Sequence, residues 1–325
     1  MKKPKNMDIQ EKKRIDELDY LRCVMIVLMV VFHLVYIESL YPYAKRVIYT
    51  FHMPVFLIIS GYLTSFEKSP MQFLRNILWL FVPYVIMESG YIWMCSLLPV
   101  GDHIDNLTVA LFFDKLFLHP IGPYWFFHTL ILCGLTCFAV FRICQTKLLS
   151  RCILCGVIFA CFSCLGMLSL PKALYFLAGV VIHYSGKSFL DVFQSSFLSL
   201  IVLVLLIIHP DNLSLGVAGG VLIVYFVISF CLSVFPYIRG RFRRVMLFLG
   251  RSTLPIFVFS PVFTILCKFL IPYFEFDKTG MLFLLVSLTV CISGSLAIGW
   301  TMDKLHISPL FFGREKIVVS SGEKS

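Results

Sequence analysis

Charged residues are scarce in this chain of 325 residues: Asp, Glu, Lys and Arg make up only 14% of it, whereas 59% of the residues are hydrophobic. An ordinary soluble protein has roughly 25% charged residues. Because a soluble domain of this size needs a polar shell around its core, the composition excludes that class of protein. The apolar residues must face a lipid bilayer instead, so we expect an integral membrane protein.

Acidic residues are the scarcer charged kind, with 18 Asp and Glu against 28 Lys and Arg. The net charge of +10 does not indicate a nucleic-acid partner, because the sequence has no basic helix with interleaved aromatic residues. The Lys and Arg lie between apolar runs, where such residues set the orientation of a protein in the membrane.

The sequence also lacks the GxSxG, Walker, HExxH and dinucleotide-binding motifs. Hydrolysis through an acyl-serine, ATP chemistry and zinc peptidase activity therefore have no support. The twelve cysteines are scattered through apolar stretches, and we interpret them as packing residues. We expect no metal site.

Nine apolar runs are long enough to cross a bilayer, which takes about 20 helical residues. They lie near residues 19–38, 48–66, 75–98, 123–143, 152–170, 190–209, 214–235, 252–271 and 280–300. A tenth run, Lys172 to Ser185, is shorter. If it crosses, 21 Lys and Arg lie on the cytoplasmic side and 6 outside; if it does not, the bias vanishes at 13 against 14.

We therefore expect an all-α fold: a polytopic membrane helix bundle of about ten transmembrane helices, with both termini cytoplasmic. A basic cytoplasmic leader, residues 1–18, precedes the membrane domain, residues 19–303, and a cytoplasmic tail, residues 304–325, follows it. One outer loop is long, and its Leu107–Leu118 portion is apolar enough to form an interfacial helix.

Ionisable side chains inside spans are candidate site residues, because each costs roughly 2.5–3.5 kcal/mol to insert. Arg22 and His33 both lie in the first span. Eleven helical residues make three turns plus about 20°, so both side chains share one face, about 16 Å apart. Glu88, His52 and His128 reach a similar depth in the next three spans.

These residues match the requirements of general acid and base catalysis, with His33 as a base that a nearby carboxylate orients. Arg22 and His33 also have simpler interpretations. Arg22 is then an anchor that snorkels to the surface, and His33 is a packing residue. Because no nucleophile accompanies His33, direct transfer between two bound substrates fits the residues better than covalent catalysis.

The pattern around these residues resembles the acyltransferase-3 family of integral membrane acyltransferases. The first part of the pattern is Leu18-Asp19-Tyr20-Leu21-Arg22, His33, Phe51-His52-Met53-Pro54-Val55-Phe56 and Ser60-Gly61-Tyr62-Leu63. The second part is Phe73-Leu74-Arg75 to Pro83, Pro123-Tyr124-Trp125-Phe126-Phe127, Tyr175-Phe176-Leu177-Ala178-Gly179 and Leu249-Gly250-Arg251-Ser252-Thr253-Leu254-Pro255-Ile256-Phe257.

The resemblance implies transfer of an acyl group, acetyl by default, from cytoplasmic acyl-CoA to a hydroxyl of a cell-surface or lipid-linked saccharide. It implies His33 as the catalytic base and Arg22 as its partner, with Pro54 and Gly61 shaping the second span. We expect Arg22, Lys68 and Arg75 to bind the CoA, and His52, His128 or a Tyr to stabilise the oxyanion. The expected location is the plasma membrane.

Two positions depart from the family pattern. Ser260 stands where many members have a His, and the basic cluster before Pro83 is reduced to Arg75. The esterase-like domain of longer members is also missing, so onward transfer would need a separate extracytoplasmic partner.

Two other functions stay open at this point: a proton-coupled transporter or flippase, which also uses intramembrane His and Glu, and a membrane scaffold.

Overall fold

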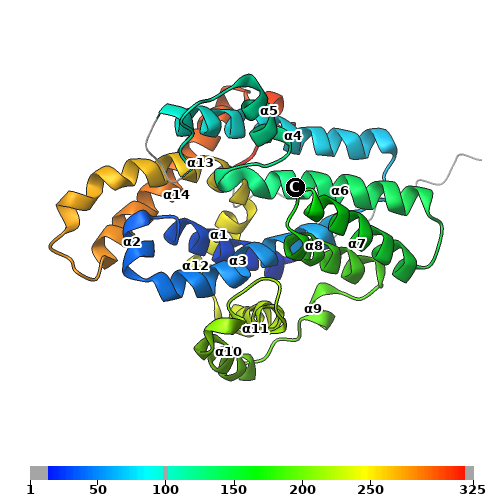
Figure 1. The fold of residues 1–325 in the computed structure, drawn as a ribbon. Helices are drawn as coiled ribbons and strands as arrows, with labels where there is room; N and C mark the ends of the chain where they lie inside the picture. The colour runs from blue at the N-terminus through cyan, green and yellow to red at the C-terminus, as the bar shows by residue number, and fades with distance from the viewer. Residues whose placement is uncertain (1–13, 98–101, 319–325) are drawn as a thin grey trace, which may run out of the picture.

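The computed structural model describes residues 14–97 and 102–318, and these residues form helices and no strands. Residues 1–13 of the expected leader and residues 319–325 of the expected tail lie outside the described residues. The all-α prediction is therefore confirmed for the described part of the chain. Figure 1 shows the helices gathered into one bundle, with α1 and α3 in its middle.

The first half of the chain forms eight α-helices and one short 3-10 helix. They are α1 (Asp16–Val31), α2 (Val35–Leu40), α3 (Pro42–Leu63), α4 (Pro70–Leu97), α5 (Val109–Phe117), η1 (Gly122–Tyr124), α6 (Trp125–Ile143), α7 (Leu148–Cys164) and α8 (Leu170–Tyr184). The helix expected within Leu107–Leu118 is present as α5.

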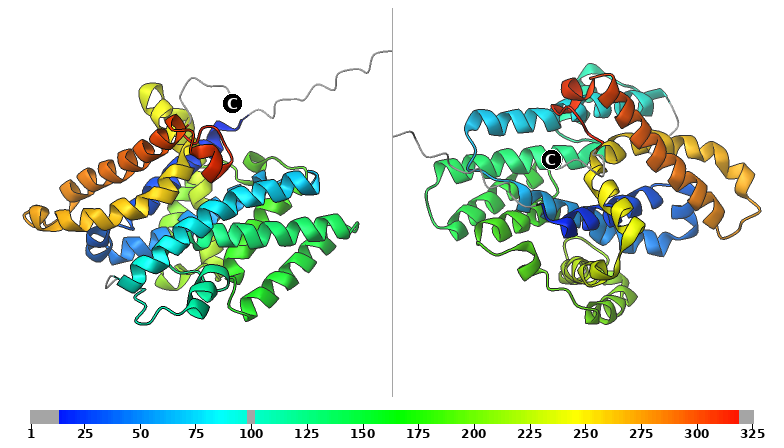
Figure 2. Two further views of the ribbon diagram at one scale, coloured as in Figure 1. Left: turned by 90° about the horizontal axis from the view of Figure 1, so that it is seen from above. Right: turned by 180° about the vertical axis from the view of Figure 1, so that it is seen from behind.

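The described residues after Tyr184 form seven α-helices and three 3-10 helices. They are α9 (Phe189–Val192), α10 (Leu198–Ile208), η2 (Pro210–Asn212), α11 (Ala218–Val234), η3 (Phe235–Tyr237), α12 (Gly240–Arg251), α13 (Thr253–Leu266), η4 (Cys267–Phe274), α14 (Met281–Lys304) and α15 (Ser308–Phe312). In Figure 2, α13 and α14 run side by side and extend away from the green helices of the middle of the chain.

Six helical segments of the described residues are long and apolar enough to cross a membrane. They are Pro42–Leu63, Pro70–Leu97, Val109–Ile143, Ala218–Tyr237, Thr253–Phe274 and Met281–Lys304. Helices α1, α7, α8 and α10 occupy the other four expected runs, but with 16, 17, 15 and 11 residues they are shorter than a straight span. Six spans are thus supported, and the count of ten stays a prediction.

The first expected span is not one continuous helix. Helix α1 ends at Val31, and a turn separates it from α2, which begins at Val35. The prediction of an unbroken helix over residues 19–38 was wrong, and His33 lies in the turn instead of on a helix face. At this helix end, the Met29 carbonyl accepts from both the backbone N–H of His33 and the His33 ring.

Two glycines allow α3 and α8 to cross at close range. A Cβ on Gly61 would lie 2.0 Å from the carbonyl oxygen of Phe176, and a Cβ on Gly179 would lie 2.0 Å from that of Ile58. Both positions therefore exclude any side chain, which agrees with the expectation that Gly61 shapes the second span. The crossing fixes α3, which carries His52, against α8.

Candidate active site

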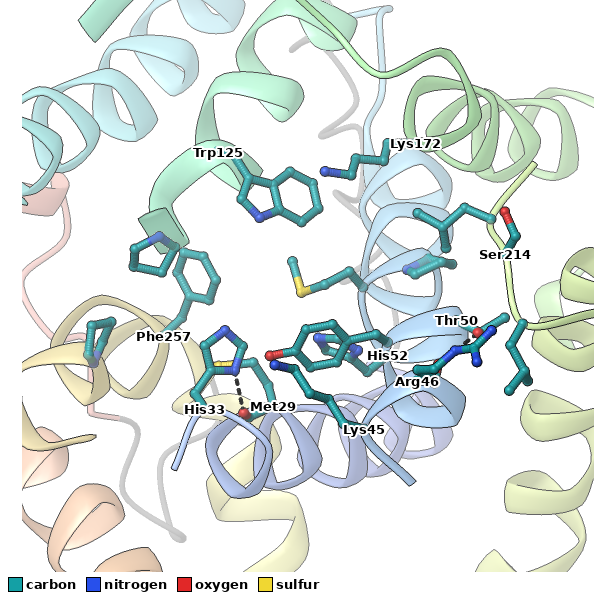
Figure 3. A pocket seen from close by; sticks show the side chains of 17 residues that line it. Met29, His33, Lys45, Arg46, Thr50, His52, Trp125, Lys172, Ser214 and Phe257 are labelled. Atoms are coloured by element: carbon teal, nitrogen blue, oxygen red, sulfur yellow. Dashed lines mark hydrogen bonds between the residues drawn. The ribbon is translucent and has the colours of Figure 1, made fainter. Parts of the chain in front are cut away.

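His33 is held by the end of α1. Its Nδ1 lies 2.6 Å from the carbonyl oxygen of Met29. A carbonyl oxygen only accepts hydrogen bonds, so Nδ1 carries the proton and donates, and Nε2 of the neutral ring is an acceptor. The ring faces a cavity (Figure 3). The imidazole therefore presents a basic nitrogen in a fixed orientation.

The group that orients His33 differs from the expected carboxylate. The Met29 carbonyl does this, whereas Glu38, the carboxylate on α2, pairs with Lys45 at 2.7 Å. Because Met29 is only four residues before His33, the end of α1 alone sets the orientation of the His33 ring.

His52 lies near His33, with Tyr49 next to both rings. The ring centroids are 5.8 Å apart for His33 and Tyr49, and 5.1 Å apart for Tyr49 and His52. His52 is buried on α3, and its Nδ1 lies 2.8 Å from the carbonyl oxygen of Ile48, so its Nε2 is also an acceptor. The structure thus brings two of the three predicted imidazoles together.

The cavity in front of these rings, which we call the histidine cavity, has a volume of about 490 Å³. This is within the usual range of ligand sites. Besides His33 and His52, its lining includes Lys45, Arg46, Tyr49, Thr50, Pro54, Trp125, Lys172, Ser214, Phe257 and Pro261. In Figure 3, His33 and Phe257 lie at one side, and Arg46 and Ser214 lie at the other.

A second cavity, which we call the arginine cavity, has a volume of about 510 Å³. Five cationic residues line it: Arg14, Arg22, Lys68, Arg251 and Arg314. No Asp or Glu is among the described residues of its lining. The cavity is suited to a ligand with several negative charges, since guanidinium groups bind phosphates through paired hydrogen bonds.

Asp19 organises three of these arginines. Its carboxylate accepts from Arg14 at 2.7 Å, from Arg251 at 3.1 Å and from Arg22 at 3.4 Å, and only 2% of its side chain is exposed. Helix α12 reaches α1 here because Gly250 has no side chain: a Cβ would lie 1.8 Å from the Asp19 carbonyl oxygen. The arginines are therefore positioned before any ligand binds.

The two cavities lie at opposite ends of the same helices. Helices α1, α3, α6 and α13 each contribute residues to both linings, for example Arg22 and Met29 from α1. Phe257 on α13 lines both cavities. Arg22 on α1 and His33 just after its last turn therefore line different cavities, and they do not share the face of one continuous helix that the sequence predicted.

Glu88 and His128 do not join either cavity. Oε1 of Glu88 accepts from the backbone N–H of Ile121 at 2.8 Å, and Oε2 has no hydrogen-bond partner among the described residues. Nε2 of His128 donates to the carbonyl oxygen of Phe117 at 2.9 Å. Both side chains are buried and bind the segment that connects α4 to α6.

Two further sequence candidates also lie away from the cavities. Arg75 is exposed and is not among the lining residues of either cavity. Ser260, at the position where many members have a His, is buried in α13 outside both linings, although its neighbour Pro261 lines the histidine cavity.

Sequence reasoning missed the role of Asp19 and of the lining residues Lys172 and Trp125. Asp19 stands three residues before Arg22, a spacing that places both side chains on one helix face. That spacing was a usable signal. Lys172 had no comparable signal, because it precedes a short apolar run and only the fold brings it to Trp125, 3.4 Å from its ring centroid.

The fold and the buried polar residues define an integral membrane protein with two facing cavities. A family model described as an acyltransferase domain, that of the acyltransferase-3 family, matches residues 15–300. The chain belongs to the acyltransferase-3 family, and it is a membrane acyltransferase. Comparison with curated proteins and with solved structures gave no match.

Proposed function

We propose that this protein transfers an acetyl group from acetyl-CoA on the cytoplasmic side of the plasma membrane to a saccharide hydroxyl on the other side. The proposal rests on the pair of cavities that share the lining residue Phe257, one with five cations and one with an oriented imidazole. Family membership favours acyl transfer over the transporter and scaffold alternatives.

The arginine cavity is the proposed donor site. CoA carries a diphosphate and a 3′-phosphate, and the cations of this cavity match that charge. Arg22 and Lys68 belong to the lining, in keeping with their expected role, whereas exposed Arg75 has no part in this proposal. The pantetheine arm then extends along α1 toward His33.

Phe257 stands where the thioester has to pass. Its ring lies 5.4 Å from that of Phe126 and 5.1 Å from that of Phe127. The aromatic side chains between the cavities leave room for a small acyl group more readily than for a long one, which supports acetyl as the group transferred. They also separate the donor site from the aqueous phase of the other side.

The proposed reaction is direct. Nε2 of His33 removes the proton of the acceptor hydroxyl as its oxygen attacks the thioester carbonyl carbon. The tetrahedral intermediate collapses, the C–S bond breaks, and the CoA sulfur takes the proton from the imidazolium. The products are the O-acetyl ester and free CoA, and no covalent enzyme intermediate forms.

The groups suggested for the oxyanion are occupied in this structure. Nδ1–H of His52 donates to the Ile48 carbonyl, the Nε2–H of His128 donates to the Phe117 carbonyl, and the Tyr49 hydroxyl donates to the Phe32 carbonyl at 3.0 Å. None of these protons faces the histidine cavity. Other side chains of its lining carry donors, namely the cationic groups of Lys45, Arg46 and Lys172, the Trp125 indole and the Ser214 hydroxyl.

The test of this function supplies acetyl-labelled CoA to sealed membrane vesicles that contain the protein. The proposal expects label in an O-acetyl saccharide on the face opposite to the donor, and none in vesicles without the protein. Transport of a saccharide without any acyl-CoA would support the transporter instead. A labelled soluble product on the donor side alone would contradict transfer across the membrane.

A further inference from the structure

The histidine cavity is positively charged. Three cationic side chains line it: Lys45 and Arg46 on α3 and Lys172 on α8. Its lining, as far as the structure describes it, contains no Asp or Glu. Of the three, only Lys45 has a carboxylate partner among the described residues: its Nζ lies 2.7 Å from Oε2 of Glu38.

Arg46 and Lys172 have neutral partners. Nη2 of Arg46 donates to the carbonyl oxygen of Pro210 at 3.4 Å, and Nζ of Lys172 lies 3.4 Å from the centroid of the Trp125 ring. The ion pairs within the described part of the chain include neither residue. A carbonyl or an indole ring attracts a cation without neutralising it.

Two cations without a carboxylate partner in one cavity favour a ligand with negative charge, because its charged group can accept charge-assisted hydrogen bonds from them. We propose that the acceptor is an anionic saccharide, whose phosphate or carboxylate binds Arg46 and Lys172 while a hydroxyl faces His33. This inference rests on the proposed function and names the class of its acceptor.

The layout of the cavity agrees with this class. Figure 3 places His33 beside Phe257, where the thioester arrives, and Arg46 at the far side, with Lys172 against Trp125. The cavity volume of about 490 Å³ is large enough for a sugar ring that contacts both the imidazole and the cations. The charged group would set which hydroxyl reaches Nε2 of His33.

The first experiment measures binding and needs no catalysis. Purified protein in nanodiscs of neutral lipid is titrated with methyl glucoside, methyl glucuronoside or glucose 1-phosphate at equal ionic strength, and its melting temperature is recorded. We expect the anionic probes to stabilise the protein at concentrations where methyl glucoside does not. Stabilisation by glucose 1-phosphate alone assigns a phosphate, and stabilisation by methyl glucuronoside alone assigns a carboxylate.

Charge-removing variants locate the site. Lys172→Gln and Arg46→Gln should each weaken anionic probe binding by about tenfold, the usual value of one hydrogen bond to a charged group. Lys268→Gln and Lys278→Gln are matched controls, because both lysines are exposed and line neither cavity. Equal stabilisation by all three probes, or anionic binding that Lys172→Gln and Arg46→Gln leave unchanged, would overturn the inference.

The second experiment separates this inference from the proposed function. Labelled product from membranes is passed over an anion exchanger, and retained product supports an anionic acceptor, whereas a neutral product overturns it. The same variants should raise the acceptor KM, since a fall in kcat at constant KM would assign the cations to the oxyanion and contradict the inference. If no labelled product forms, the proposed function fails, and the binding experiment still decides whether this cavity holds anionic saccharides.

Discussion

The ring of Phe257 packs 5.4 Å from the ring of Phe126, and Phe257 lines both the arginine cavity and the histidine cavity. Its side chain is 9% exposed. In the proposed transfer, the acetyl thioester passes this ring on its way from the arginine cavity to the histidine cavity. The relationship makes Phe257 a candidate determinant of acyl length.

Phe257→Ala should widen acyl specificity. The two extra methylene groups of butanoyl-CoA are worth about 0.8 kcal/mol each once they are accommodated, so we expect its rate relative to acetyl-CoA to rise roughly tenfold. Initial rates with the two donors measure this ratio. Phe259→Ala is the matched control, because Phe259 is similarly buried on the same helix and lines neither cavity. An unchanged ratio in Phe257→Ala would refute the claim that the acyl group passes Phe257 between the two cavities.

Arg22→Gln should weaken the binding of acetyl-CoA, because Arg22 is proposed to bind the phosphates of the CoA. We expect the KM for acetyl-CoA to rise by about tenfold, because one charge-assisted hydrogen bond is lost. The KM for acetyl-pantetheine, which has no phosphate, should stay the same. Arg142→Gln serves as the control, since Arg142 is exposed and outside both linings. Equal effects on the two donors would assign Arg22 to the packing of α1 instead.

Variants of Glu88 test whether its carboxyl group has a structural role or takes part in catalysis. Glu88→Gln keeps an oxygen to accept from the Ile121 N–H, so it should retain transfer. Glu88→Ala leaves that buried N–H without an acceptor and should lower the free energy of unfolding by roughly 1–3 kcal/mol. Loss of transfer in a stable Glu88→Gln protein would show that the carboxyl group takes part in proton transfer.

The loop before α14 should make stability depend on pH. The Asp277 carboxylate accepts from Oγ1 of Thr279 at 2.6 Å and from the N–H of Leu282 at 2.8 Å, and these bonds lower the pKa of Asp277. Its stabilising contribution is therefore present above the unfolded-state pKa and is lost as the pH falls through the lower folded-state pKa.

The measurement compares the melting temperatures of the wild type and Asp277→Asn from neutral pH to about pH 3, below the usual aspartate pKa. We expect Asp277→Asn to melt lower at neutral pH, with a difference that shrinks on acidification. Glu275→Gln, an exposed neighbour, should show no such trend. A gap that stays constant with pH would contradict a role for the ionised carboxylate.

The sequence predicted the helical class for a physical reason, and it made Arg22 and His33 candidate site residues for a related one. Apolar runs of membrane length can be identified from the sequence alone, and so can an ionisable side chain within one, such as Arg22 or His33. The break after Val31 was not predictable, because neither Gly nor Pro marks it. The apolar pattern of Leu107–Leu118 also predicted a helix correctly, and α5 lies within it.

The site was predicted less completely than the helices. Counting residues from a span end gives depth but no lateral position, so Glu88 and His128 were grouped with His33 although they bind the segment between α4 and α6. Lys172 entered the site only through the packing of α8 against α3, which the sequence pattern does not encode.

In the proposed reaction, Nε2 of His33 takes the proton of the acceptor hydroxyl. The most direct measurement is transfer of labelled acetyl from acetyl-CoA by His33→Ala protein, with membrane insertion and acetyl-CoA binding measured on the same sample. Exposed His209→Ala is the control. We predict loss of transfer by at least about 100-fold, the lower range for a general base, with donor binding retained. Transfer at the wild-type rate by inserted His33→Ala protein would contradict the account.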